Sequence, residues 1–382
     1  KVSQDIDKIN KLGHKIHELN QQISKIEAGG IETAMDLRDE RDLALDQLGA
    51  LAKISYKEDY KGVVTVKLED EYFVDELHTY EIGKKTDKLT GFITPYWPQL
   101  SDTDRDIYVN VFDFNVDIST ALNSDVGELK ALIMSRGDHW ADYSDIEGKG
   151  EQEYLDTTNL SVIIDMQAKL DQMVHNMITA INDQLCPNVT GPVGVTYQDA
   201  NGNTVNLSDA KVLDTENCAR GSDGELPPRE LFVRAGIERY TEVTGSDGKT
   251  YYVYNEEDTS DTSYMYSLTS CGVNEELKKI ETLFPHLKQN GEVDQQLGER
   301  LEALWNKDLV GLDPTDPDEC NIEEYYQKMI GGLATVGNVY QKKAENLAGS
   351  VLTIENNRQQ VIGVSSGKHF LPLQDLLSFS DS

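Results

Sequence analysis

Basic residues are scarce in this 382-residue chain. It carries 35 lysines and arginines against 68 aspartates and glutamates, which gives a formal net charge of −33 at pH 7. Nucleic acids and anionic membrane surfaces are bound chiefly by clustered Lys and Arg side chains that displace counterions. The charge balance therefore predicts no nucleic-acid partner and no membrane partner.

Long apolar runs are lacking as well. No stretch approaches the roughly 20 apolar residues that cross a bilayer. The first residues, KVSQDIDKIN, also lack the apolar segment of a secretory signal peptide. We expect a soluble chain, or one that begins inside a longer protein.

Cysteine is sparse and widely spaced. Cys186, Cys218, Cys271 and Cys320 form no CxxC pair, so the spacing typical of a structural zinc site is missing. The spacing does not choose among the possible disulfide pairings. Separate buried thiols are the simpler expectation, because free cysteine behaves as a small apolar side chain.

Recognisable catalytic motifs are missing too. The sequence has no GxSxG, HExxH or GxxxxGK[ST] motif. His14 and His17 stand one helical turn apart, but no third ligand is near in sequence, so a solvated helix face is the simpler interpretation. The run DTDRD at Asp102 resembles the start of a calcium loop, yet Ile107 stands where the sharp turn needs Gly. We predict no enzymatic activity, no cofactor and no metal.

Residues 1–55 read as a helical hairpin. Apolar residues recur in heptads from Val2 to Ile26, and Gly29-Gly30 ends that helix. The second helix, expected from Ile31, contains DLRDERDLALDQL, in which opposite charges about one turn apart are expected to pair along the helix. The predicted buried positions of the hairpin are Ile9, Leu12, Ile16, Leu19, Ile23, Leu43 and Leu48.

Residues 56–124 are predicted to be a β-rich insertion. GVVTVKLEDEYFV alternates apolar and polar residues as a half-buried strand does, and DIYVNVFDFNVDIS does so less cleanly. Helical periodicity returns over 125–186. The tripeptide Arg136-Gly137-Asp138, which some cell-adhesion receptors read, is interpreted there as the end of the helix GELKALIMSR.

The longest face of the central helices is expected to be buried, with Asn159 or Thr158 as the helix cap. It comprises Ile163, Met166, Leu170, Met173, Met177, Ile181 and Leu185.

Residues 187–319 are predicted to be a second β-rich insertion with short helices, since DANGNT and GSDGKT place Gly where hairpin turns need positive φ. Residues 320–366 form a returning long helix, in which a seven-residue repeat includes Leu333, Leu347 and Ile354 as buried positions. Residues 367–382 are an atypical tail, with Pro372 interrupting any helix.

The predicted fold is thus α+β: an elongated, coiled-coil-like rod of several helices with inserted β-rich domains. Each helix is too polar to stand alone, so the helices are expected to bury their stripes against one another.

Several segments resemble the flagellar hook-associated protein 1 family. They include VSQDIDKINKLGHKIHELNQQISKIEAGG with DLRDERDLALDQLGALAKISY, and the helices GELKALIMSRGD and LDQMVHNMITAIND. The returning helix, with N-x-R-x-x-x-x-G-V-S at 357–365, is also similar to that family.

The resemblance implies a structural subunit at the junction of hook and filament, which assembles with copies of itself into a ring. Its implied partners are the hook protein, a filament-side junction protein, and an export chaperone that binds a C-terminal segment this chain lacks. Export without a cleaved signal peptide to the extracellular flagellum is implied as well. The residues alone leave a second function open, a surface adhesin or binding module that uses the β-rich insertions.

Overall fold

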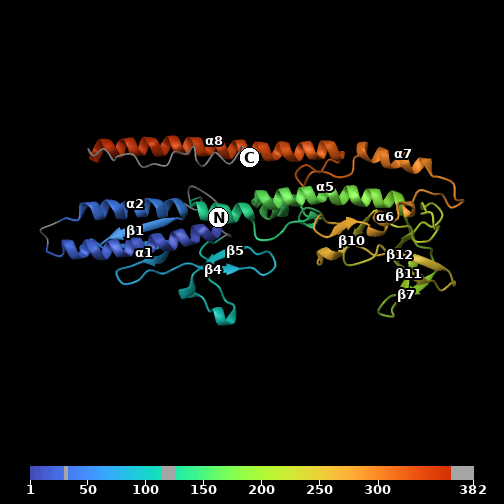
Figure 1. The fold of residues 1–382 in the computed structure, drawn as a ribbon, viewed down its shortest axis with the longest axis horizontal. Coiled ribbons are helices and arrows are strands. Elements are labelled where there is room, and N and C mark those ends of the chain that lie inside the picture. Colours follow the sequence, from blue (N-terminus) through green and yellow to red (C-terminus); the bar gives the residue numbers. More distant parts are fainter. Residues whose placement is uncertain (30–32, 114–125, 363–382) are drawn as a thin grey trace. The chain divides into compact units, whose positions relative to one another are not determined.

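The computed structural model describes residues 1–29, 33–113 and 126–362. In this part of the chain, helices alternate with small antiparallel sheets, so the fold class is α+β (Figure 1). Residues 1–325 form one compact unit, and the chain from Tyr326 onward forms a second. The predicted tail at 367–382, the GVS motif and the helix start at Ile31 lie outside the described residues.

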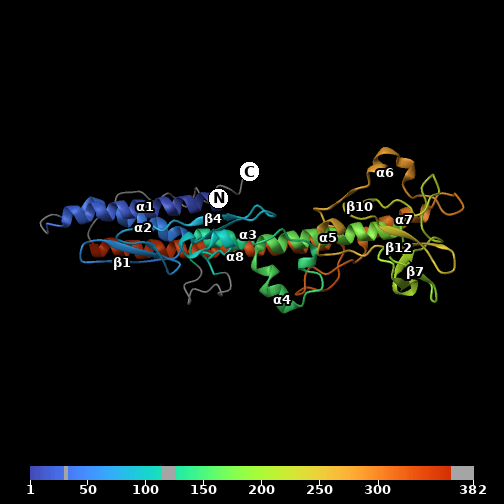
Figure 2. The same cartoon turned by 90° about the horizontal axis from the view of Figure 1, so that it is seen from below.

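The N-terminal hairpin consists of α1 (Val2–Glu27) and α2 (Met35–Leu51), which lie side by side in both ribbon views (Figures 1 and 2). The heptad positions of α1 face inward. Six of the residues predicted to be buried in this hairpin have at most 6% of their surface exposed, namely Ile9, Leu12, Ile16, Leu19, Ile23 and Leu48.

Leu43 is the exception in this hairpin, because 48% of its surface is exposed. The prediction that it is buried is wrong. The inward face of α2 follows Arg41, Ala44, Leu45 and Leu48, and Leu43 lies two residues, or about 200°, away from Leu45. Arg41 takes an inward position because its guanidinium donates to Gly62 O, to Asn20 Oδ1 and to Glu58 Oε2.

Two arginines of α2 pair with residues of other elements rather than along their own helix. Arg38 Nε and Nη2 both donate to the carboxylate of Glu27 in α1, and Nη1 donates to Glu58 in β1. The hydrogen bond from Arg38, helped by that from Ala34 N, lowers the pKa of Glu27 to about 2. These arginines tie α2 to α1 and to the first sheet.

The first β region packs on the hairpin. Strands β1 (Ile54–Glu58), β2 (Val64–Leu68) and β3 (Glu71–Val74) form an antiparallel sheet in that order. Strands β4 (Gly83–Thr86) and β5 (Ile93–Tyr96) pair separately. One hydrophobic core unites side chains of α1 and α2 with Val66, Phe73 and Trp97.

Two sequence predictions in this region need correction. GVVTVKLEDEYFV is not one strand, because Glu69 and Asp70 both adopt positive φ and turn the chain between β2 and β3. The described part of DIYVNVFDFNVDIS forms isolated bridges such as Tyr96 to Asn110 rather than a strand. The remainder of that run, from residue 114, lies outside the described residues.

The central helices are α3 (Glu128–Arg136), α4 (Glu151–Asp156) and α5 (Val162–Leu185). The predicted end of α3 is confirmed: Gly137 has a φ of 78°, and its N–H donates to Ile133 O. The predicted cap of α5 is wrong. Ser161 caps it, because its hydroxyl accepts a hydrogen bond from Ile164 N at 3.3 Å.

The second β region contains a four-stranded sheet in the order β11-β12-β9-β6, formed by Tyr240–Thr244, Thr250–Tyr254, Lys211–Leu213 and Asn188–Thr190. Two smaller pairs accompany it: β7 (Thr196–Gln198) with β8 (Thr204–Asn206), and β10 (Phe232–Arg234) with β13 (Cys271–Val273). Both predicted hairpin turns are confirmed, with positive φ at Gly202 and Gly248.

The chain then forms α6 (Glu275–Lys279), α7 (Gln295–Ala303) and the 3₁₀ helix η9 (Leu304–Asn306). The described part of the chain ends in α8 (Ile322–Ile362), a single helix of 41 residues that begins in the first unit.

Three residues of α8 were predicted to be buried, but Leu333 is 38% exposed, and Leu347 and Ile354 are each 66% exposed. The predicted burial of these three residues is therefore not found. The part of α8 after Tyr325 forms a unit of its own, and a single helix cannot bury its own side chains.

Candidate assembly surface

Helix α5 buries polar residues together with apolar ones, and part of its predicted apolar stripe is exposed. Lys169, Asp171, Gln172 and Asn182 are all buried. By contrast, Ile163 is 45% and Leu170 38% exposed. Met173 and Ile181, which are predicted to lie in the packed core of the rod, are half-buried. The apolar stripe is real, but it does not mark the innermost face of this helix.

The burial of these polar residues has a physical cause: their side chains form hydrogen bonds with backbone groups of neighbouring segments. Asn182 Nδ2 donates to Phe232 O at 2.8 Å, while its Oδ1 accepts from Leu231 N and Phe232 N. Asp171 accepts from Tyr143 N at 2.9 Å and from Leu268 N at 2.6 Å. Buried backbone groups require such partners, so a polar stripe can be the interior one.

A buried ionic cluster joins the end of α5 to the four-stranded sheet. Glu230 accepts from the hydroxyl of Tyr266 and from Asn182 Nδ2, and one of its oxygens lies 3.7 Å from Arg239 Nη1. Arg239 in turn donates to Asp183 of α5. Burial raises the pKa of Glu230 to about 7, and hydrogen bonding to Tyr266 and the charge of Arg239 oppose that rise.

A second polar cluster holds the first turn of α8. The Tyr325 hydroxyl lies 2.9 Å from both Lys169 O and Gln172 Oε1. Lys169 Nζ lies 2.9 Å from the carboxylates of Asp165 and Asp313. Burial tends to raise the pKa of Asp313, but hydrogen bonds from Thr315 and Lys169 outweigh it and lower that pKa. The cluster fixes where α8 starts.

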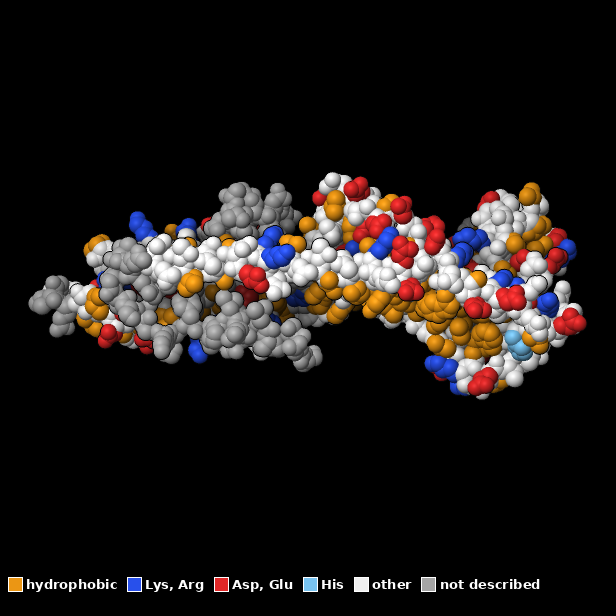
Figure 3. Space-filling model, turned by 90° about the horizontal axis from the view of Figure 1, so that it is seen from above, with side chains coloured by type: hydrophobic (Ala, Val, Ile, Leu, Met, Phe, Trp, Pro, Cys, Tyr) orange, Lys and Arg blue, Asp and Glu red, His pale blue; other side chains and the backbone are white. Residues whose placement is uncertain are grey.

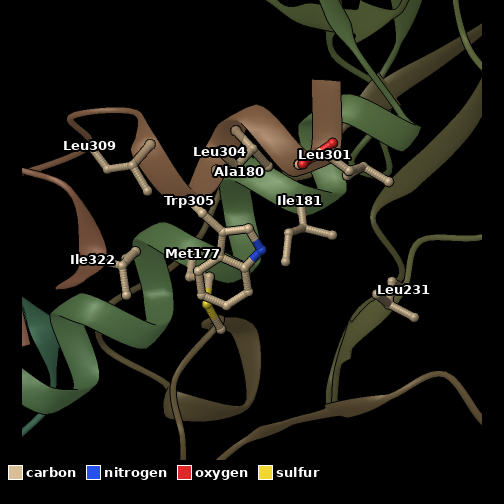
Figure 4. A pocket seen from close by; sticks show the side chains of 10 residues that line it. Met177, Ala180, Ile181, Leu231, Leu301, Leu304, Trp305, Leu309 and Ile322 are labelled. Atoms are coloured by element: carbon tan, nitrogen blue, oxygen red, sulfur yellow. The ribbon is translucent and has the colours of Figure 1, made fainter. Parts of the chain in front are cut away.

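An apolar groove lies beside these clusters, between α5 and the segment from α7 to the first turn of α8. Its volume is about 320 Å³. Figure 4 shows the Trp305 indole projecting between Met177 and Ile181, with Leu309 and Ile322 on one side and Leu231 on the other. Trp305 is 60% exposed. Figure 3 shows hydrophobic side chains gathered as a band on the half of the molecule that contains α5 and α7.

The histidine and aspartate motifs considered as metal sites have other contacts. His14 Nε2 pairs with Glu81, and His17 Nδ1 lies 3.3 Å from Asp75 O. Asp102 caps the 3₁₀ helix Thr103–Arg105 by accepting from Arg105 N. Within residues 1–29, 33–113 and 126–362, no group of three His, Cys, Asp or Glu side chains is placed to hold a metal ion.

The arginine of the cell-adhesion tripeptide is engaged within the fold, whereas the Asp138 side chain is exposed. The Arg136 guanidinium lies 4.4 Å from the centre of the Phe92 ring, and its Nη1 donates to Ile93 O at 3.1 Å. The four cysteines are free thiols, and all but Cys271 are buried. None of the helices in the described part of the chain is long and apolar enough to cross a membrane.

Residues 1–194, just over half of the chain, match the model of the helical domain of the flagellar hook-associated protein FlgK. The chain belongs to the FlgK family. Family membership places it among the flagellar hook-associated proteins. The family model covers α1 to α5 and the strands between them, which include the hairpin and the polar face described above.

No curated protein matches this FlgK-family chain. Among solved structures, the flagellar hook junction protein FlgK from Burkholderia pseudomallei is similar at 14% identity and a TM-score of 0.36. The match covers 75% of this chain and 50% of the Burkholderia chain, so this chain spans about half the length of that protein. The family assignment rests on the family model.

Proposed function

We propose that this chain is the outer portion of a structural adaptor subunit that joins the flagellar hook to the filament by assembling into a junction ring. The observation that carries the proposal is the match of residues 1–194 to the FlgK helical domain. In this proposal the helices form a rod, and the segments 56–124 and 187–319 form its β-rich side domains. The subunit is not an enzyme.

The proposed partners are copies of the same subunit, the hook protein and the filament-side junction protein. An export chaperone is a further proposed partner, and the subunit is proposed to be exported to the extracellular flagellum. The ion pairs between α1, α2 and β1 support a structural role, because Arg38 and Arg41 connect three elements through Glu27 and Glu58.

Complementation tests the proposal. The full-length gene should restore swimming and filament attachment to a strain that lacks its junction protein, and so should a version in which a short linker replaces residues 187–272. If the intact gene restores no filament attachment, the adaptor function is wrong. If the shortened version swims but loses attachment to surfaces, the β-rich segment is an adhesive module.

A further inference from the structure

The turn between β7 and β8 carries an exposed Asn-Gly bond. Asn201 and Gly202 both lie at the surface, and Gly202 has a φ of 79°. Gly202 N donates to Asp199 O at 3.0 Å, and Asn201 N donates to Asp199 Oδ1 at 2.9 Å. Both hydrogen bonds engage the backbone, and neither restrains the side-chain amide of Asn201.

The Asn201 side chain makes no hydrogen bond within residues 1–29, 33–113 and 126–362, the part of the chain that the structure describes. Its neighbour Asn203, by contrast, donates from Nδ2 to Asp199 Oδ2 at 3.0 Å. The surroundings are open as well, because a Cβ placed on Gly202 would meet no atom within 4 Å. The Asn201 amide is therefore free to rotate toward Gly202 N, and water reaches both residues.

The other Asn-Gly bond of the sequence, Asn290-Gly291, provides a matched comparison. Gly291 has a φ of 82°, and its N–H donates to Lys288 O at 2.9 Å. Here the asparagine side chain is held at both ends: Asn290 Oδ1 accepts from Glu292 N at 3.0 Å, and its Nδ2 donates to Glu292 Oε2 at 2.9 Å. The two turns thus share a backbone arrangement and differ in the freedom of the asparagine amide.

We propose that Asn201, in preference to Asn290, is a site of spontaneous deamidation with water as the co-reactant. Gly202 N loses its proton and attacks Asn201 Cγ, so that a new C–N bond closes a succinimide ring. The Cγ–NH2 bond breaks, and the side-chain nitrogen leaves with a proton as ammonia. Water then opens the ring at either carbonyl carbon, which gives aspartate or isoaspartate. A carboxylate thereby replaces a neutral amide.

The difference between the two sites follows from what each asparagine must give up. Glycine leaves the approach to its nitrogen open because it has no side chain, and this holds for both bonds. A hydrogen bond that is present in the ground state and lost on attack slows a reaction by up to about tenfold, which corresponds to its net strength. Asn201 has no such bond to lose and should deamidate about tenfold faster than Asn290.

The products change the tip of the β7–β8 hairpin. The Asp199 carboxylate already accepts from Asn201 N and Asn203 N, so a second carboxylate in the same turn places like charges close together. Isoaspartate also adds a methylene group to the main chain, and turn geometry sets the register in which Gln198 pairs with Thr204. Deamidation therefore adds negative charge to the second β region and loosens this hairpin.

Ageing of the intact chain in mildly alkaline buffer tests the proposal. Peptide mapping by mass spectrometry follows the conversion of amide to acid at each asparagine, and labelling with isoaspartyl methyltransferase detects the isoaspartate. Conversion at Asn201 should lead that at Asn290 by about tenfold. Asn201→Gln is the control, because its longer side chain does not close the same ring, and it should lack the early product. Glu292→Ala removes one of the two restraints on Asn290 and should speed conversion there while Asn201 keeps its rate.

Unfolding in urea separates the effect of structure from that of sequence. With the hydrogen bonds to Glu292 gone, the two Asn-Gly bonds should convert at similar rates. Three outcomes overturn the proposal: Asn201 stays intact in the folded protein, the two sites convert equally fast in the folded protein, or their difference persists in urea. An unchanged rate at Asn290 in Glu292→Ala, together with an undiminished difference, would overturn it as well.

Discussion

The Tyr325 hydroxyl lies 2.9 Å from Gln172 Oε1, and this pair ties the first turn of α8 to the middle of α5. Tyr325 is completely buried. Its hydroxyl is also 2.9 Å from Lys169 O and 3.3 Å from Leu312 O, so a single proton is shared among three buried acceptors. Tyr325→Phe should therefore lower the free energy of unfolding by about 1–3 kcal/mol, the cost of unsatisfied buried polar groups.

Urea unfolding measures this difference, and the next residue supplies the control. Tyr326 is 51% exposed, so Tyr326→Phe should change the free energy of unfolding by no more than about 0.5 kcal/mol. Equal losses for the two substitutions would show that the Tyr325 hydroxyl anchors nothing.

Two leucines of α2 provide a matched test of the hairpin. Leu48 is completely buried, whereas Leu43 is 48% exposed. Leu48→Ala should cost about 2–4 kcal/mol because it leaves a cavity in the core shared with the first sheet. Leu43→Ala should cost less than about 1 kcal/mol. Thermal and urea unfolding of both variants decide the point, and a larger loss for Leu43→Ala would contradict the register of α2.

His139 should make stability depend on pH. The hydrogen bond to Asp145, with a further one to Asp138, raises the pKa of His139 from 6.5 to about 9. Because the folded-state pKa is the higher one, the stabilisation is complete below pH 6.5 and disappears as the pH rises through about 9. The stability difference between wild type and His139→Ala should shrink across that window.

The titration of His139 can be followed directly by NMR of the imidazole protons. Asp145→Asn should move the midpoint back toward 6.5, because the principal hydrogen-bond partner has lost its charge. A wild-type midpoint already near 6.5 would refute the assignment.

Glu230 should act with the opposite sign. Burial raises its pKa from 4.5 to about 7, so the folded protein holds a proton that the unfolded chain has released, and stability falls as the pH rises from about 4.5 to 7. Relative to wild type, Glu230→Gln should lose this slope, which amounts to up to about 3 kcal/mol. Urea unfolding at several pH values measures it, and identical slopes for the two proteins would mean that Glu230 remains ionised beside Arg239.

The sequence revealed the helices better than it revealed their inward faces. In α1 the heptads predict the buried residues because the partner surface is apolar and side chains such as Ile9 and Ile16 fill it. In α5 the same reasoning succeeds only in part: Leu185 is buried as predicted, but backbone groups of the neighbouring segments need hydrogen bonds, so polar residues share the inward face. Asn182 and Asp171 supply those bonds, and a hydrophobic pattern gives polar residues no weight. The sequence signal that could have predicted this buried polar face was the row of polar side chains at helical spacing.

Some of the turns could be predicted from the sequence and others could not. Gly202 and Gly248 adopt positive φ at low cost, so their hairpins were predictable from Asn-Gly and Asp-Gly. Glu69 and Asp70 adopt positive φ without such a signal. The groove at Trp305 could not be predicted, because its residues lie far apart in the sequence and meet only through the path of the 301–322 segment.

The backbone-directed contacts of α5 have a consequence for how the second β region can change over time. Asn182 and Asp171 contact main-chain groups of Phe232 and Leu268, which every amino acid except proline presents alike. The side chains of these segments can therefore change by mutation while their backbone hydrogen bonds to α5 remain. A lineage can thus diversify the exposed face of this region and keep the helix that carries it unaltered.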